Sequence, residues 1–471
     1  MALENQASSL YWTRSPASTY ERGLDPIEKL YHFISKIGQG CPDRDNWRCT
    51  ACAKITTDLD NLTERLRLVW KQTRFQFPAI AAHIDGDHWV YQPAGAEELE
   101  SWMQETFRVI ETTGTARAGW QVEGVESPRL SLYFFTNTRE IVIRGPHTHL
   151  DGIGMMTLLK FIMQALVKND LPVADGTETK NLLPPLAITT KVPLHTPKQK
   201  KRFEEAMQHF LANHNGVRVR SENAGAPAGK TKLRWLVYTA SETAAIAARC
   251  KQLGFSVTAC MQAAAGRTAR IHGQVSGTRH ATMAIYDGRG YIDPSEIQHD
   301  RLVGPHVFAM PAVYPISPES FVETALSAKA VLASFREDDL VRSTSDLWSA
   351  AARAMLAHAP PPDQPVAADL QLSSLGILDR HLPRSYRSDD GAQVEAEDAW
   401  IALDLLNPLV TVEAWTFRDR LNIEIIFNEA YYRDDSISLM ATLLHEQLTE
   451  GLGLDLAFDL RTPGEEEFTK I

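Results

Sequence analysis

Two histidines and an aspartate stand together in the stretch "REIVIRGPHTHLDGIGMMTLLKFI", residues 139–162. His147 and Asp151 are four residues apart, Gly152 follows directly, and His149 lies between them. An imidazole at the edge of an apolar core can take a proton from an alcohol, amine or thiol near neutral pH, because burial tunes its pKa. A histidine in this place could therefore take part in acid–base chemistry.

The residues on either side of the motif predict the elements that position it. "REIVIRG" is a short apolar strand, and "GIGMMTLLKFIMQALVK" is a helix that is apolar nearly all round, so both are expected to be buried. Asp151 stands where a carboxylate can cap the first free N–H groups of that helix. Gly152 lets another backbone or a ligand approach closely. We expect the motif to occupy the turn between strand and helix, at the edge of the core.

The same spacing occurs a second time, so spacing alone is weak evidence for a site. His83 and Asp87 are also four residues apart, in "HIDGD". The aspartates there lie in a predicted hairpin turn, no glycine follows Asp87, and no helix begins. A lone histidine near an apolar strand is usually a hydrogen-bonded core residue. The strand, glycine and buried helix around His147 make it the stronger candidate.

The composition restricts the class of protein. The chain has 471 residues, 44% of them hydrophobic, which suits two domains or two halves of one large fold. The formal net charge of −11, spread along the chain, argues against a nucleic-acid-binding surface. No apolar run approaches the roughly 20 residues that span a bilayer, and the first residues lack the pattern of a secretory signal. We expect a cytosolic protein.

Five cysteines suit a reducing compartment, and three of them raise the question of a metal site. Cys41, Cys49 and Cys52 stand close together in "CPDRDNWRCTACAK". A structural zinc site needs four ligands, usually as two spaced pairs, and the sequence offers no second pair. We expect free thiols and no metal, with zinc binding and redox chemistry as the weaker alternatives.

Strands and helices alternate in both halves of the chain, which predicts mixed α/β layers. Hairpins are predicted within residues 79–92 and 130–145, and a capping box at Thr239 begins a helix in the second half. Composition shifts toward Pro, Thr and Lys after residue 171, and a Ser-, Gly- and Ala-rich loop follows. The predicted division is an N-terminal half that carries the motif, a crossing linker with a flexible loop, and a C-terminal half, at residues 1–185, 186–230 and 231–471.

The pattern H-x-x-x-D-G between a strand and a buried helix resembles the CoA-dependent acyltransferase superfamily. This group includes chloramphenicol acetyltransferase, the plant BAHD acyltransferases and peptide-synthetase condensation domains. The resemblance extends over most of the chain: "AIYDGRGYI" is similar to the strand whose arginine pairs with the motif aspartate, and "SSLGIL" to the S-x-x-G strand. Within the group, "ELESWMQETFRVI" most resembles the fungal trichothecene 15-O-acetyltransferase type.

Two departures separate the chain from other branches of the superfamily. The D-F-G-W-G motif of the plant branch is absent, and Pro146 replaces the first histidine of the doubled-histidine motif of condensation domains. Neither departure touches His147 or Asp151. Both argue against a plant-type acceptor or a carrier-protein donor.

The resemblance implies an α/β fold of two chloramphenicol-acetyltransferase-like halves, each a mixed β-sheet with helices, meeting at a central tunnel. It implies His147 as general base and Asp151 as a structural partner of Arg289, supported by Gly152. Ser374 becomes a candidate for oxyanion or substrate contact, with a structural strand serine as the alternative. His149 is either a packed neighbour or a second substrate contact.

The function implied is an acyl-CoA-dependent O-acyltransferase that transfers an acyl group directly. Acetyl-CoA is the expected co-substrate, a hydroxyl of a secondary metabolite such as a terpenoid the expected acceptor, and no cofactor is permanently bound. We expect a monomer without nucleic-acid partners or membrane spans. Two alternatives are a condensation-type enzyme, which uses carrier-bound acyl groups or forms amide bonds, and a catalytically silent binding module. The intact H-x-x-x-D-G motif argues against a protein without catalytic activity.

Overall fold

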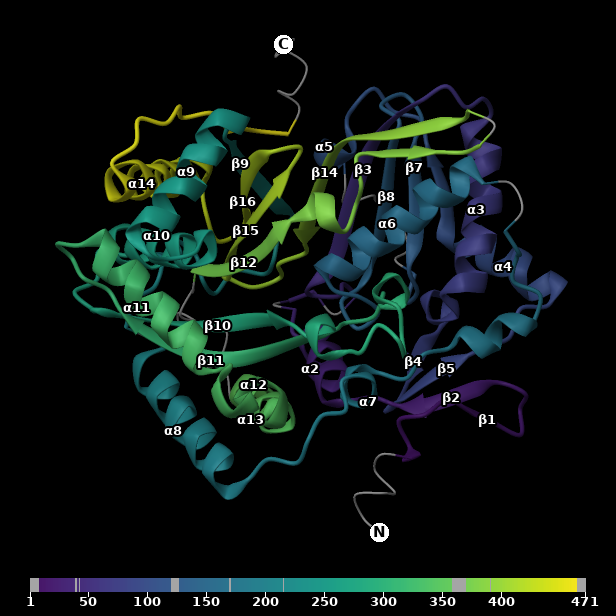
Figure 1. Cartoon of the computed structure of the whole chain (residues 1–471), viewed down its shortest axis with the longest axis horizontal. Helices are drawn as coiled ribbons and strands as arrows, with labels where there is room; N and C mark the ends of the chain where they lie inside the picture. Colours follow the sequence, from purple (N-terminus) through teal and green to yellow (C-terminus); the bar gives the residue numbers. More distant parts are fainter. Residues whose placement is uncertain are drawn as a thin grey trace.

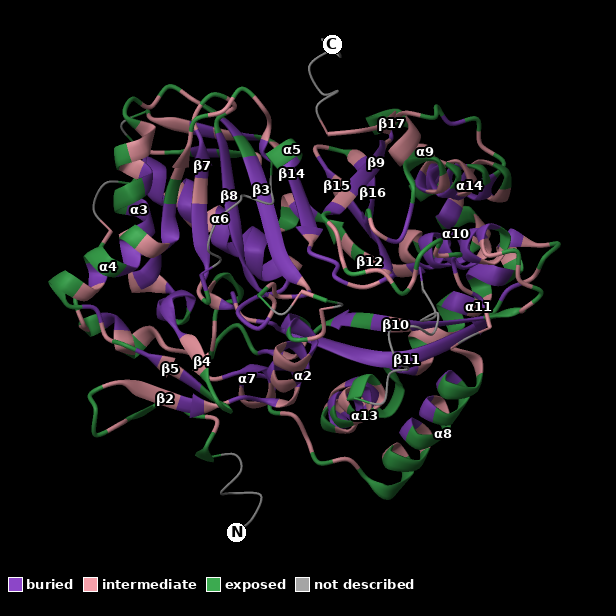
Figure 2. Ribbon diagram, turned by 180° about the vertical axis from the view of Figure 1, so that it is seen from behind, coloured by how far each residue is buried: buried purple, intermediate pink, exposed green. Residues whose placement is uncertain are grey.

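The structure is a computed structural model, and it describes residues 8–38, 40–41, 43–119, 127–168, 171–214, 216–357, 370–389 and 391–463. Figure 1 shows two sheets side by side, each with helices packed against it, and a long two-stranded ribbon below them. Most strands of the two large sheets are buried (Figure 2). No helix within these ranges is both long and apolar enough to cross a bilayer.

The first sheet has six strands and holds the motif. Its central strand β3 pairs antiparallel with β8 on one side and with β14 on the other, although β14 comes late in the chain. The buried helix α6 packs on β3, β14 and helix α3. In sheet order the strands are β13 (Ser385–Arg387), β14 (Gln393–Leu403), β3 (Arg48–Thr57), β8 (Glu140–Pro146), β7 (Ser131–Phe135) and β6 (Phe107–Ile110), and the helices packed with them are α3 (Leu62–Gln76), α4 (Ala96–Thr106) and α6 (Gly152–Val167).

The second sheet has five strands, and helices cover one of its faces. Its edge strand β12 runs parallel to β15, whereas its other pairs are antiparallel. The strands in order are β12 (Leu370–Ile377), β15 (Val410–Phe417), β16 (Arg420–Asn428), β9 (Thr231–Val237) and β17 (Leu460–Arg461), and the helices are α9 (Ala240–Leu253), α10 (Val257–His272) and α14 (Asp434–Leu452).

A two-stranded antiparallel ribbon and its helices form a third packed unit. The ribbon strands β10 (Arg279–Asp287) and β11 (Val307–Pro315) pack with α2 (Pro26–Ser35), α8 (Pro197–Asn213), α11 (Phe321–Ser334), α12 (Leu340–Ser343) and α13 (Ser345–Ala357). A small sheet near the N-terminus contains β1 (Thr13–Arg14), β2 (Tyr20–Gly23), β5 (His88–Tyr91) and β4 (His83–Asp85), and the short helices α5 and α7 cover Ala116–Gly119 and Leu186–Thr189.

The predicted mixed α/β class is confirmed, as are both hairpins and the apolar helix after the motif. Helix α8 was missed, because its residues were assigned to the crossing linker. Its signal is local: Thr196 caps the helix, Pro197 occupies the first turn, and Gln199 completes a capping box. The division into halves at residues 185 and 231 stays a prediction.

Candidate active site

The motif occupies the turn between the first sheet's strand β8 and helix α6, as the sequence predicted. Strand β8 ends at Pro146 and the helix begins at Gly152. Asp151 is the N-cap, and its Oδ1 accepts a hydrogen bond of 2.7 Å from the Gly154 N–H. The turn is therefore fixed at its helical end by a carboxylate that satisfies a free backbone donor.

A buried ion pair joins the motif to the segment that follows β10. Both nitrogens of the Arg289 fork donate to the Asp151 carboxylate, at 3.0 and 2.9 Å, and the His306 N–H donates to it at 2.7 Å. Arg289 lies just past β10, in the 3₁₀ turn Arg289–Tyr291, and also donates to the carbonyl groups of Leu302 and Gly304. Each side chain of the pair is only 4% exposed.

The pair sets the charge state of the motif carboxylate. Burial by itself would raise the pKa of Asp151, but the Arg289 charge and the hydrogen bonds outweigh it and hold that pKa below its ordinary value. Asp151 points to Arg289 and to backbone donors, and no hydrogen bond from its side chain to the imidazole of His147 occurs among the described residues.

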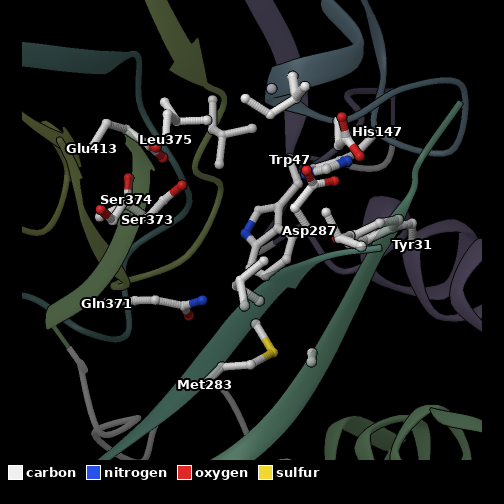
Figure 3. Close-up of a pocket in the computed structure, with 18 of the residues that line it drawn as sticks. Tyr31, Trp47, His147, Met283, Asp287, Gln371, Ser373, Ser374, Leu375 and Glu413 are labelled. Carbon is white, nitrogen blue, oxygen red and sulfur yellow. The ribbon is translucent and has the colours of Figure 1, made fainter. Parts of the chain in front are cut away.

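His147 faces a cavity of about 200 Å³ that lies between the two large sheets and the ribbon. Tyr31 of α2 stacks on the imidazole, with ring centres 4.0 Å apart and planes 18° apart, and Trp47 lies tilted beside it at 6.2 Å. Figure 3 shows Tyr31 and Trp47 beside His147, with Ser373, Ser374 and Glu413 on the opposite wall. The ring is thus held in one plane by aromatic contact.

Burial controls the protonation of His147. It lowers the pKa of the imidazole below 6.5, although backbone groups and the Asp151 charge act in the other direction. Nδ1 is buried and has no hydrogen-bond partner among the described residues. A neutral imidazole that lines a cavity can serve as a general base through a nitrogen that reaches the cavity.

The other predicted residues occupy different places. His149 is buried, its Nε2 lies 3.0 Å from the Ala82 carbonyl oxygen, and its ring meets Trp89 edge to face. It lines a separate cavity of about 70 Å³ and not the cavity of His147. Ser374 does line the cavity of His147, and its Oγ lies 3.0 Å from the Thr258 Oγ1.

Comparison with curated proteins finds fungal relatives across most of the chain, although no family model matches it. The O-acetyltransferase pigM of Monascus ruber is 23% identical over 462 residues, covering 94% of this chain and 88% of its own. The acetyltransferase pigO of the same fungus is 24% identical over 463 residues, covering 94% and 98%. The lolU1 protein of Epichloe uncinata, named a loline biosynthesis cluster transcription factor, is 25% identical over 501 residues, covering 94% and 97%.

Comparison with solved structures shows the fold. TRI3 trichothecene 15-O-acetyltransferase from Fusarium sporotrichioides superposes with a TM-score of 0.80 at 18% identity, covering 94% of this chain and 98% of that one. The first condensation domain of the calcium-dependent antibiotic synthetase gives 0.63 at 12% identity, covering 93% and 98%. The chain is an acyltransferase of the condensation-like fold.

Several residues of the candidate site were not found from the sequence. Gly154 lies so close to the Val303 carbonyl oxygen that any Cβ there would clash, and the G-x-G after the motif was the available signal. Tyr31 and Trp47 had no such signal, because they lie 116 and 100 residues before His147 in the chain. Glu413 reaches the cavity only through the pairing of β12 with β15.

The weaker alternative, a zinc site at the N-terminal cysteines, finds no support in the part of the chain that the structure describes. Cys49 and Cys52 are buried on β3, Cys41 is partly buried, and no disulfide joins any of the five cysteines. Within the described ranges, no group of three or more His, Cys, Asp or Glu side chains is arranged to hold a metal ion.

The ion pair generates a double-mutant test. Asp151→Asn removes the buried carboxylate that both nitrogens of the Arg289 fork contact and leaves only the exposed carboxylate of Asp287 at 3.1 Å, so we expect a loss toward the lower end of about 3–5 kcal/mol of stability. Turnover should fall about 10²-fold as well, because a misplacement near 1 Å at His147 has that effect. Arg289→Gln should behave alike, and the double variant should be less damaged than the sum of the singles, because the two side chains are in contact.

Melting temperature and turnover of the three variants measure both effects. Additive losses would contradict the account. So would Asp151→Asn that is inactive at unchanged stability while Arg289→Gln behaves as wild type, because the carboxylate would then act on the reaction and not on the turn.

The stacked tyrosine generates a second test. Tyr31→Phe keeps the ring and should leave kcat near that of wild type. Tyr31→Leu removes the aromatic surface that orients the imidazole, so we expect kcat of the folded protein to fall by about tenfold or more, with some loss of melting temperature because Tyr31 belongs to the core. Steady-state turnover of the two variants decides between them. Full activity in Tyr31→Leu would show that the stack does not position His147.

Proposed function

We propose that this acyltransferase moves an acyl group, acetyl in the first instance, from acyl-CoA to a hydroxyl of a small secondary metabolite such as a terpenoid. The observation that carries the proposal is His147, which lines a cavity between the two sheets, stacks on Tyr31 and has a pKa that desolvation lowers. The acetyltransferase names of pigM, pigO and TRI3 support the acyl group and the CoA donor.

The proposed reaction is a direct transfer without an acyl-enzyme. Nε2 of His147 accepts the proton of the acceptor hydroxyl while the hydroxyl oxygen bonds to the thioester carbonyl carbon. The tetrahedral intermediate then collapses, the carbon–sulfur bond breaks, and the imidazolium returns its proton to the departing CoA sulfur. Burial favours the neutral imidazole that the first step requires.

Other side chains have supporting roles in this proposal. Asp151 and Arg289 act on the turn and not on the substrate, so they are positioning residues. Ser374 is proposed to stabilise the oxyanion or contact the substrate, because its hydroxyl lines the cavity beside Thr258. The base comes from the proposed half 1–185 and the opposite wall from the half 231–471, so activity depends on both.

Two other functions compete with this proposal. A condensation-type enzyme with carrier-bound acyl groups has support from the condensation-domain fold, but Pro146 stands where that motif has its first histidine. A non-catalytic role has support only from the name of lolU1. Binding to DNA fits poorly with a formal net charge of −11.

The assignment of His147 as the base is tested with His83 as the control, because His83 begins the second H-x-x-x-D of the sequence. We expect His147→Ala to lower turnover by about 10²–10⁴-fold, the usual effect of a lost general base. His83→Ala should stay within a few-fold of wild type, because His83 lies in the small N-terminal sheet and does not line the cavity. Release of free thiol from acetyl-CoA across a panel of terpenoid alcohols, amines and carrier-bound acceptors is the measurement.

Each result has a clear meaning. Thiol release with alcohols supports the proposal, release only with carrier-bound acceptors or amines would favour the condensation type, and none at all would favour a silent module. An inactive His83→Ala beside an active His147→Ala would show that the base had been assigned to the wrong motif.

A further inference from the structure

A compact set of polar side chains lies on the wall of the cavity that faces the second sheet. Strands β12 and β15 run parallel there, with Gln371 opposite Thr411 and Ser373 opposite Glu413. All four residues line the cavity of His147, and we call them the polar patch. Figure 3 shows Gln371, Ser373 and Glu413 across the cavity from His147, with Trp47 and Met283 between the two sides.

The fold itself does not call for polar residues at this place. The alternate residues of the same strands, Leu370 and Leu372 on β12 and Val410 and Val412 on β15, are buried in the apolar core under the helices. Placing polar groups inside a protein without full hydrogen bonding costs free energy. A polar patch on an interior sheet face therefore needs a reason beyond folding.

Glu413 is the most demanding member of the patch. It is 2% exposed and bonds the hydroxyl of Ser373, and no ion pair of Glu413 occurs among the residues described. Burial raises the pKa of its carboxyl to about 7. Glu424, opposite it on β16, has its own cation, since Arg117 lies at 3.7 Å. The Glu413 carboxyl thus lacks a nearby cation such as Arg117 provides for Glu424.

Thr411 gives a second, independent observation. Its side chain is 3% exposed, and its Oγ1 has no hydrogen-bond partner within the described parts of the chain. A buried hydroxyl left unsatisfied is costly, and a ligand oxygen in the cavity would supply the missing partner. A carboxyl, a hydroxyl and the Gln371 amide together can both donate and accept hydrogen bonds.

We propose that the polar patch binds a second oxygen substituent of the acceptor, remote from the hydroxyl that is acylated, with Glu413 and Thr411 determining this preference. An acceptor that presents one hydroxyl to His147 directs its far end toward the opposite wall. The favoured acceptors are then alcohols with an apolar middle and an oxygen function at each end, and alcohols without the second oxygen are bound poorly. This inference rests on the proposed function, because it takes the cavity to be the acceptor site.

Binding of matched alcohols to the full-length protein tests the proposal without turnover. The probes are terminal alkane diols, from hexane- to decane-α,ω-diol, each compared with its own mono-ol by isothermal titration calorimetry. A purely apolar cavity prefers the mono-ol, because the extra hydroxyl must leave water. We expect the wild-type protein to bind the best-fitting diol about tenfold more tightly than its mono-ol, the scale of one or two good hydrogen bonds.

Four variants and a control show which residues cause the preference for the diol. Glu413→Leu and Thr411→Val should each reduce the diol-to-mono-ol affinity ratio, and the double variant should bring it to one or below. Glu413→Gln, which keeps a donor and an acceptor, should retain most of it. Thr416→Val makes the same substitution on the same strand at a residue that does not line the cavity, and should leave the ratio unchanged.

A wild-type ratio at or below one for every chain length would overturn the proposal, and so would a ratio that the double variant keeps. These outcomes are separate from failure of the proposed function. That failure appears as no thiol release from acetyl-CoA with any alcohol, whereas the calorimetric ratio is measured without a donor.

Discussion

The buried pair of Asp151 and Arg289 is the interaction on which the rest of the site depends. Two charges removed from water must compensate each other, and here a bidentate contact does so with both side chains almost wholly enclosed. The same carboxylate caps α6 and accepts from the His306 N–H, while the same guanidinium donates to the Leu302 carbonyl. One ion pair thus joins the motif turn, the start of a buried helix and the segment between β10 and β11.

The ion pair between Asp151 and Arg289 also determines the position of His147. The imidazole follows the last residue of β8 by one position and precedes the helix cap by four, so any shift of the turn moves it. Tyr31 restricts the ring from one side through stacking. The position of the His147 imidazole therefore depends on the ion pair, and its orientation depends on Tyr31 of α2.

Burial acts on three titratable groups of the cavity with different results. Asp151 stays charged because Arg289 and backbone donors outweigh desolvation. His147 is held toward its neutral form, with a lowered pKa, and Glu413 toward its neutral form, with a raised one, because desolvation dominates at both. The site thus combines a fixed anion, a neutral base and an uncompensated carboxyl within one enclosed space.

Local sequence patterns were sufficient to predict the elements whose structure depends on residues close together in the chain. The apolar helix, both hairpins and the motif turn follow from residues adjacent in sequence, and the partnership of Arg289 with Asp151 followed from the family resemblance. Tyr31, Thr411 and Glu413 could not be predicted, because they reach the cavity through helix packing and through the parallel register of β12 and β15. Helix α8 had a local signal, a capping box, that the Pro- and Lys-rich composition around it obscured.

The central claim, that a neutral His147 at the wall of the cavity is the general base, is tested most directly by the pH dependence of kcat/KM. The neutral form is the active one and its pKa is lowered, so kcat/KM should rise with pH through a midpoint below 6.5 and be level around pH 7. The same acid limb should persist in Glu413→Gln, which removes a carboxyl of the cavity with a pKa of about 7 and leaves His147 in place. A midpoint at or above 6.5, or an acid limb that disappears in Glu413→Gln, would contradict the account.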